Sequence, residues 1–292
     1  MKKFAFILLL AGTKIAFCQN AKQDTTLVYS SPMYTKDPVR SKWIPVVKKT
    51  GEFYQVTFYD KKNVAQELIS FEDPKLSVRK GEYIRYTAGK ISEKGMYDKG
   101  YKNGEWLTYI KDGSLKKSEN FYYGKLDGHF SEYWDSQQIK QQGSYENGRK
   151  IGLWKLFYLD GKLAGEENYD VYGKKEKSNY FHKNGEPAKY EDLFAPPSYE
   201  GGINEFYRFL GTKIQYPRSS YSNRIEGTVT LRFTVKKDGS VEDVEIISAP
   251  NGELGDEAVR VLSMSRNWIP GKMFGEEVNV KYNIPIKFSL KR

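Results

Sequence analysis

Residues that could perform acid–base, nucleophilic or metal chemistry are few and scattered in this sequence of 292 residues. His129 and His182 are the only histidines, and Cys18 is the only cysteine. A metal site needs several His, Cys or carboxylate ligands at a suitable spacing, which neither histidine has around it. Adjacent carboxylates occur at Glu166-Glu167 and Asp256-Glu257, but no partner acid, base or nucleophile accompanies them. We therefore predict no catalytic residue, no metal site and no cofactor, and a protein that is not an enzyme.

The composition points to a folded, β-rich protein that acts through binding. Hydrophobic residues make up 39% and aromatic residues 15% of the chain, which is enough for cored domains, and the length allows two or three of them. The net charge is +10, but the basic residues do not gather into one stripe. Nucleic acid is therefore not an expected partner. With a single cysteine, the chain has no internal disulfide.

The first 18 residues have the pattern of a secretory signal. Two lysines precede an apolar run at residues 4–11, and Lys14 follows it. This run is too short to cross a bilayer, which takes about 20 residues. We expect cleavage before Gln19, which removes residues 1–18. Two alternatives stay open: the Cys18 segment resembles a lipobox, which would give an outer-membrane lipoprotein, and retention of the segment would give an inner-membrane anchor.

The central part of the chain, residues 81–187, repeats itself with a period of 24 residues. Each copy reads G-x-W-x-x-Y-x-x-x-G, which predicts an aromatic strand, a glycine turn and a polar returning strand. This pattern resembles MORN-type repeats, and five hairpins of this kind would make a ribbon of about 45 to 50 Å. The aromatic residues that share a register are Tyr97, Phe121, Tyr145 and Tyr169, and then Trp106, Phe130 and Trp154.

Two interpretations of this aromatic row are possible. The rings can stack as a core between hairpins, which is usual for aromatic residues at a fixed register. Alternatively, the row can be a binding surface for lipid, glycan or another protein. Residues 19–80 before the repeats contain short apolar and aromatic runs and are expected to be a β-rich segment, whereas residues 188–198 behind them, which are rich in proline, are expected to be a linker.

The last part of the chain, residues 199–292, alternates between helical and strand periods. Helical spacing over 202–214 and 251–265 predicts two amphipathic helices. Period-two alternation over Gly227–Val235 predicts a strand, and Asp238-Gly239 a tight turn into a returning strand whose apolar phase slips near Asp243, which predicts a bulge. A closing strand is expected over Val278–Leu290. The fold class is therefore α+β, two helices on a three-stranded antiparallel sheet, behind an all-β ribbon of repeated hairpins.

An ordered series of motifs in this region resembles the C-terminal domain of TonB-family proteins. The resemblance implies a periplasmic domain that binds a short peptide, the TonB box, of an outer-membrane TonB-dependent receptor. It also implies that this peptide adds beside the last strand and passes close to a Tyr-Pro motif. The series comprises Pro197-Ser198-Tyr199-Glu200-Gly201-Gly202, Ile214-Gln215-Tyr216-Pro217, Gly227-x-Val229, Asp238-Gly239-Ser240-Val241, Leu254, Asp256-x-Ala258, Trp268-x-Pro270-Gly271 and Tyr282-x-Ile284-Pro285-Ile286-x-Phe288.

The residues themselves agree with a binding site at the last strand. Pro285 cannot donate to a ladder, so one side of this strand should be unpaired. Unpaired edges invite pairing with another chain, and a second copy of this chain is the alternative partner, which would make a homodimer. The candidate peptide-binding residues are Tyr216, Pro217, Lys281, Tyr282, Asn283, Ile284, Ile286 and Phe288.

Two points about these residues stay open in the sequence. Tyr216 and Pro217 could instead only cap the preceding helix and pack beneath the sheet. If the amides of Tyr282 and Ile284 face the partner, a proline at either position should abolish pairing.

Two functions fit these features. The first is a TonB-like periplasmic protein that docks outer-membrane transporters and, by resemblance, passes energy to them from an inner-membrane proton-motive complex. Force transmission needs a retained membrane helix and a long proline-rich segment, which the sequence does not display, so docking is the narrower expectation. The alternative is a non-transducing scaffold or binding protein of the cell envelope that uses the repeats.

Overall fold

The computed structural model describes residues 37–135, 137–265 and 268–290. The expected signal segment, with Cys18, lies outside the described residues. Two compact units make up the chain: one runs to Gly161 and includes Glu166–Ser178, and the other holds Lys162–Gly165 and the residues from Asn179 onward. Within the described residues, no helix combines the length and the apolar character that a bilayer crossing requires.

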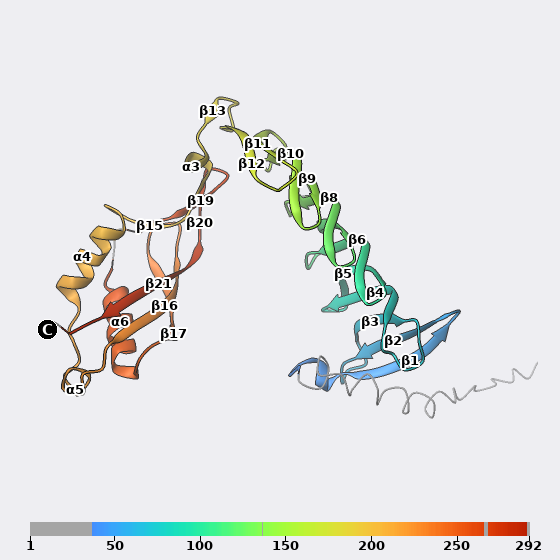
Figure 1. The fold of residues 1–292 in the computed structure, drawn as a ribbon, viewed down its shortest axis with the longest axis horizontal. Helices are drawn as coiled ribbons and strands as arrows, with labels where there is room; N and C mark the ends of the chain where they lie inside the picture. The colour runs from blue at the N-terminus through green and yellow to red at the C-terminus, as the bar shows by residue number, and fades with distance from the viewer. Residues whose placement is uncertain (1–36, 136, 266–267, 291–292) are drawn as a thin grey trace, which may run out of the picture. The chain divides into compact units, whose positions relative to one another are not determined.

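Short antiparallel strands, each paired with the next one along the chain, build the part that precedes the C-terminal domain (Figure 1). A single 3-10 turn, η1 (Arg40–Lys42), comes first. The strands of this sheet are β1 (Ile44–Thr50), β2 (Phe53–Tyr59), β3 (Ala65–Phe71), β4 (Arg79–Thr87), β5 (Lys90–Asp98), β6 (Tyr101–Tyr109), β7 (Leu115–Tyr122), β8 (Lys125–Tyr133), β9 (Ile139–Glu146), β10 (Arg149–Phe157), β11 (Leu163–Tyr169), β12 (Lys175–Phe181) and β13 (Pro187–Ala188). A ribbon of consecutive hairpins is thus present where the sequence repeats.

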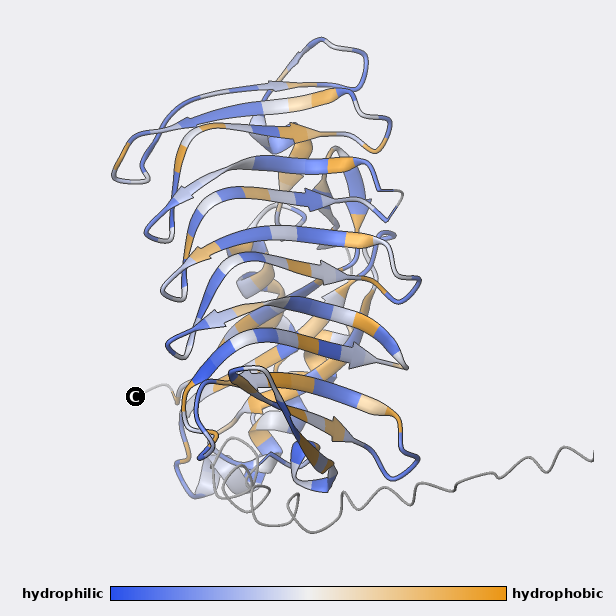
Figure 2. Ribbon diagram, turned by 90° about the vertical axis from the view of Figure 1, so that its right-hand side faces the viewer, coloured by the Kyte–Doolittle hydropathy of each residue, from blue (hydrophilic) through white to orange (hydrophobic). Residues whose placement is uncertain are grey.

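The aromatic row of the repeats is core. Trp106 and Trp154 are each 1% exposed, and hydrophobic and hydrophilic residues alternate along the strands (Figure 2). The ring of Trp106 lies 5.2 Å from that of Tyr83, and the ring of Trp154 lies 5.4 Å from that of Phe130. Buried rings at these distances contribute stability through area and ring geometry. For Trp106, Phe130 and Trp154 the interpretation as an exposed binding surface is therefore wrong, because their rings are buried. The other rings of the row are half-buried, namely those of Tyr97, Phe121, Tyr145 and Tyr169.

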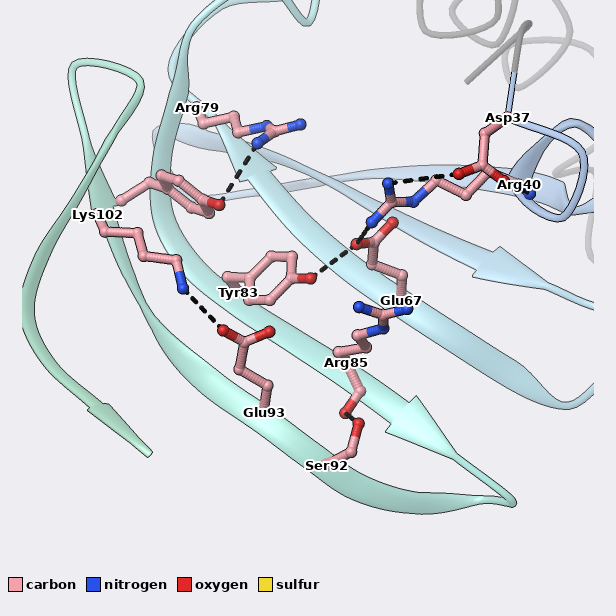
Figure 3. Close-up of polar contacts among 10 residues, drawn as sticks. Asp37, Arg40, Glu67, Arg79, Tyr83, Arg85, Ser92, Glu93 and Lys102 are labelled. Carbon is pink, nitrogen blue, oxygen red and sulfur yellow. Dashed lines mark hydrogen bonds and ion pairs between the residues drawn. The ribbon is translucent and has the colours of Figure 1, made fainter. Parts of the chain in front are cut away.

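A buried carboxylate ties the start of the ribbon together (Figure 3). Glu67 of β3 is 1% exposed and accepts hydrogen bonds from the Tyr83 hydroxyl at 2.8 Å and from Arg40 Nη2 at 3.1 Å. The Asp37 carboxylate in turn accepts from the backbone N–H groups of Val39 and Arg40, both at 2.8 Å. Because a buried carboxylate is costly unless paired, this contact fixes the turn η1 against the sheet.

The second unit contains the predicted α+β domain. Its sheet has the order β17-β16-β21, with β16 (Gly227–Val235) between β17 (Val241–Ser248) and β21 (Val280–Phe288). Helices α4 (Ile203–Lys213) and α6 (Gly252–Ser263) lie beside this sheet in Figure 1. Their apolar stripes share one core with the sheet, which includes Phe206, Leu210, Leu254, Ala258, Val261, Leu262, Val229, Leu231, Phe233, Ile284, Ile286 and Phe288.

The predicted bulge is confirmed at Asp243. The register between β16 and β17 passes from Arg232 opposite Glu245 to Thr234 opposite Glu242, so β17 carries an extra residue there. Asp243 has a φ of 53°, and its carboxylate accepts a hydrogen bond of 3.0 Å from the Thr234 hydroxyl. This contact compensates for the left-handed backbone, which Asp tolerates better than most residues.

The segment expected as a linker, residues 188–198, is instead folded. It forms α3 (Tyr190–Leu193), β14 (Phe194–Ala195) and the start of β15 (Ser198–Tyr199), and these strands pair with β19 (Gly271–Met273) and β18 (Trp268–Ile269). Leu193 is fully buried, and the ring of Phe194 lies 5.0 Å from that of Phe274. Apolar burial therefore holds this segment in place despite its prolines.

Two further differences concern the helices and the closing strand. A short helix, α5 (Arg218–Ser222), follows α4 and was not predicted. The closing strand is divided into β20 (Glu276–Val278), which pairs with β19, and β21. The division falls at Asn279, whose side-chain oxygen accepts a hydrogen bond of 3.0 Å from the Lys237 N–H. This side-chain contact replaces a regular ladder at that residue.

Candidate functional site

Strand β21 lies at an edge of the C-terminal sheet. It pairs with β16 without interruption, from Gly227 opposite Phe288 to Val235 opposite Val280. Within the described residues no strand pairs with its other side. Nine residues of regular strand therefore present one row of backbone groups that the fold does not use.

The hairpin between β16 and β17 decides which amides of β21 form this row. The Lys236 N–H donates to the Ser240 carbonyl at 2.9 Å, so Lys236 faces β17. The backbone N–H and C=O groups of successive residues point to opposite sides of an antiparallel strand. Those of the odd-numbered residues of β16 therefore point toward β21. Their partners in β21 are the even-numbered residues, such as Ile284 opposite Leu231. The N–H groups of Lys281, Asn283 and Lys287 consequently face the open side.

Pro285 supports this assignment independently. It belongs to the same odd-numbered row, and a proline within a sheet is tolerated where its nitrogen needs no partner. The expectation that the amides of Tyr282 and Ile284 could face a partner is thereby corrected, because both residues point their backbone groups toward β16. Lys287 was missing from the candidate residues. The sequence contained a signal for it, because Lys287 is an odd-numbered residue like Pro285, and the proline marks the side of the strand that needs no N–H donor.

The side chains of β21 separate in the same way. Ile284, Ile286 and Phe288 are buried in the core, and Tyr282 is half-buried against Phe233 and Trp268. The side chains of Lys281, Asn283, Pro285 and Lys287 are exposed on the opposite face. The buried candidates therefore support the strand, whereas the odd-numbered residues are the ones that another chain can reach.

The opposite edge of the sheet, β17, is less suited to accept another strand. Its ladder is broken at two places, and bulges are a common protection of sheet edges. Its carboxylates also have cationic partners: Glu242 lies 3.0 Å from Lys236 Nζ, and Glu245 lies 3.9 Å from Arg232 Nη1. Of the two edges, β21 is the regular one.

The Tyr-Pro motif lies at the end of β21 where the sheet meets α5. The Tyr216 hydroxyl donates to the Ile225 carbonyl at 2.5 Å, and its ring meets that of Phe288 edge to face at 5.9 Å. Burial raises the pKa of the Tyr216 hydroxyl. Pro217 is the residue before the first turn of α5. The motif thus packs against the last residue of β21, but it does not cap the preceding helix, since α4 is capped by Ile214 and Pro217 stands before α5.

Two carboxylates of α6 hold the segment that carries this motif. Glu257 accepts from the Gln215 N–H at 2.6 Å and from Arg260 Nε and Nη2 at 2.7 and 2.8 Å. These hydrogen bonds, above all those from Arg260, lower the pKa of Glu257. One turn earlier, Glu253 accepts from the Ser220 N–H at 3.1 Å and from its hydroxyl at 2.7 Å. The sequence showed Glu257 only as one of two adjacent carboxylates, since nothing local reveals a partner some forty residues away.

The histidines have structural surroundings. His129 Nε2 lies 2.9 Å from the Ser131 hydroxyl, and His182 Nε2 lies 3.9 Å from Asp192 with both side chains largely exposed. In the described ranges, no group of His, Cys, Asp and Glu side chains is placed to hold a metal ion.

Comparison with known proteins identifies the domain that contains this edge. Residues 212–290 match the family described as Gram-negative bacterial TonB protein C-terminal. Over 100 residues, or 32% of this chain, the sequence is 31% identical to Protein TonB of Helicobacter pylori strain ATCC 700392 / 26695 and 32% identical to that of strain J99 / ATCC 700824. The match spans about a third, 34%, of the length of these curated relatives.

One solved structure was also compared with the chain. The NMR solution structure of the H. pylori TonB C-terminal domain is 27% identical in sequence, with 31% of this chain and 81% of that chain covered and a TM-score of 0.26. On the family match and the two relatives, the chain carries a TonB C-terminal domain at its C-terminal end.

Proposed function

We propose that the C-terminal domain docks an outer-membrane TonB-dependent receptor by accepting an extended segment of it, of the TonB-box kind, as a further strand beside β21. The observation that carries this proposal is the uninterrupted pairing of β21, which among the described residues has a neighbour on one side only. Strand addition takes its affinity from main-chain hydrogen bonds. The open row offers N–H donors at Lys281, Asn283 and Lys287 and carbonyls at the same residues and at Pro285.

The likeness to TonB proteins supports the rest of the proposal. We place the protein in the periplasm, with the ribbon as a spacer and without enzymatic activity. The buried aromatic row favours a spacer over a ligand surface, because its rings already serve as core. In the fuller form of the proposal, an inner-membrane proton-motive complex is the second partner and energy passes through the chain to the receptor.

Photo-crosslinking in intact cells tests the docking step. A photoreactive amino acid replaces Asn283 on the open edge, and a matched control carries it at Glu245 on the β17 edge. We expect crosslinks from position 283 to outer-membrane receptors, identified by mass spectrometry, and few from position 245. Crosslinks from 283 only to a second copy of the chain would identify a homodimer instead, and equal capture from both positions would contradict the placement.

The non-transducing scaffold is the alternative, and the mature N-terminus separates the two. Fractionation with N-terminal sequencing is the measurement. A chain that keeps its first residues in the inner membrane would support transduction. A mature chain starting at Gln19 would limit the function to docking or scaffolding.

A further inference from the structure

We infer that the segment received by β21 carries acidic side chains six residues apart on one face, facing Lys281 and Lys287, and apolar side chains on the other face. This inference rests on the proposed function and adds to it the chemical class of the partner. It follows from three features of the edge: the register of the open row, the charges along it and the contrast between the two faces.

The open row and the exposed face of β21 coincide. Lys281, Asn283, Pro285 and Lys287 direct their backbone groups to the open side and expose their side chains on one face. A strand added here places every second residue directly beside one of these four, with side chains on the same face. The residues beside Lys281 and Lys287 are six positions apart in that strand.

The described part of the chain offers neither lysine an anionic partner. Among the described residues, neither Lys281 nor Lys287 forms an ion pair. The cations of β16 and of the turn behind it do have anionic partners, since Lys236 pairs with Glu242 and Arg232 pairs with Glu245. Arg232 Nε also donates a hydrogen bond of 3.3 Å to Asn283 Oδ1. Lys281 and Lys287 therefore make the exposed face of β21 positive.

The opposite face of an added strand meets different surroundings. Its side chains lie beside Val280 and Tyr282, which are half-buried, and beside the buried residues Ile284 and Ile286. Apolar side chains continue the core there, whereas charged ones would lose water without a partner. The preferred segment is therefore amphipathic with period two.

Lysines on a sheet edge also discourage unwanted pairing. The two roles agree, because lysines that repel a basic strand, and that lose water beside an apolar one, favour an acidic strand. Opposite charges directly across two strands favour pairing, and two such pairs correspond to about a 2- to 30-fold difference in affinity. Because the pairs are exposed, salt should reduce the difference.

Three end-capped fluorescent peptides test this inference on the full-length mature protein. They share one alternating sequence of Val and Thr and differ only at two positions six residues apart on the Thr face, which are Glu, Gln or Lys. Binding is measured by fluorescence anisotropy at low and high salt, with the wild type, the charge reversal Lys281→Glu/Lys287→Glu and the control Lys213→Glu/Lys237→Glu. The control changes the net charge of the same domain equally, at exposed lysines outside β21.

We expect the Glu peptide to bind more tightly than the Gln peptide, and the Gln peptide more tightly than the Lys peptide. This order should reverse in Lys281→Glu/Lys287→Glu and persist in the control. Equal affinity of the three peptides for the wild type, with binding lost in Asn283→Pro, would overturn the inference and leave strand addition standing. No binding of any peptide, together with no receptor crosslinks from position 283, would overturn both.

Discussion

Trp106 lies flat on Gly95: a Cβ atom added to this glycine would come within 2.3 Å of the indole Cδ2. Two repeat lengths later, Trp154 lies on Gly143 with the same distance of 2.3 Å. A lysine covers each indole, with Lys102 Nζ at 3.8 Å from the Trp106 ring and Lys150 Nζ at 4.0 Å from the Trp154 ring. The glycine leaves room for the ring, and the lysine ammonium lies over the ring as a cation–π contact.

Alanine at Gly95 or Gly143 should therefore destabilise the ribbon by about 1 to 3 kcal/mol, because a buried indole must shift to admit the new methyl group. Urea unfolding of the full chain, followed by tryptophan fluorescence, measures the loss. Gly211→Ala is the control, since nothing lies within 4 Å of its added Cβ. Alanine there should leave the ribbon unchanged. An unaltered midpoint in Gly95→Ala would show that the indole is loosely held.

How much of this arrangement the sequence predicts depends on the range of the interaction. Period-two and helical patterns are local, and they predicted β16, β21, α4, α6 and the bulge at Asp243. The short strands β14 and β15 were missed because their partners, β19 and β18, lie about seventy to eighty residues further on and form only two-residue ladders with them. Such pairings leave no periodic pattern.

The sequence predicted which strand forms the candidate site, but not which of its backbone N–H groups point to the open side. The side-chain pattern of β21 assigns its buried face, but backbone direction depends on which neighbour each residue faces. The hydrogen bond from Lys236 to Ser240 settles this in the structure. Pro285 contained the same information, because a residue without an N–H group belongs on the unpaired side.

The Glu67 cluster should make the ribbon sensitive to alkaline pH. Burial, reinforced by the Glu67 carboxylate, raises the pKa of the Tyr83 hydroxyl. In the unfolded chain a tyrosine ionises near its usual pKa of about 10. Since the folded value is the higher one, this contribution to stability is complete below about pH 10 and is lost as the pH rises further.

Unfolding midpoints between about pH 8 and pH 11 test this expectation, because they bracket the usual tyrosine pKa. We expect the ribbon to lose stability above about pH 10, and Tyr83→Phe to lose less with pH while being less stable at neutral pH. Burial also raises the pKa of Tyr97 and Tyr145, so part of the slope should remain in the variant. An identical slope in Tyr83→Phe would assign the effect to other groups.

Glu257 should position the Tyr216 segment rather than contact a partner. Because its pKa is held below the ordinary value of 4.5, mainly by Arg260, its contribution to stability is present at neutral pH and is lost as the pH falls through the lowered pKa. Glu257→Gln should destabilise the C-terminal domain by about 1 to 3 kcal/mol at pH 7, as expected for hydrogen bonds to a charged group.

The difference between Glu257→Gln and the wild type should shrink at about pH 3, below the ordinary glutamate pKa of 4.5, because the contribution of a lowered pKa is lost as the pH falls. Circular dichroism melts at both pH values provide the measurement. Asp256→Asn is the matched control, because Asp256 is the exposed neighbour of Glu257 and should tolerate the loss of its charge. If both variants lose the same stability, the contact with Gln215 and Arg260 has no special role.

Proline substitutions at adjacent residues of β21 should separate folding from docking. The Tyr282 N–H faces β16, so Tyr282→Pro removes a ladder hydrogen bond and should destabilise the domain by about 3 kcal/mol. The Asn283 N–H faces the open side, as the nitrogen of Pro285 already does, so Asn283→Pro should retain most of the stability and lose receptor crosslinks.

Pro285→Ala should strengthen docking, because it restores an N–H donor to the open row. Thermal melts and crosslinking from a photoreactive residue at Lys281 measure both effects. If Asn283→Pro unfolds the domain while Tyr282→Pro does not, the two rows are exchanged and the partner meets the even-numbered residues.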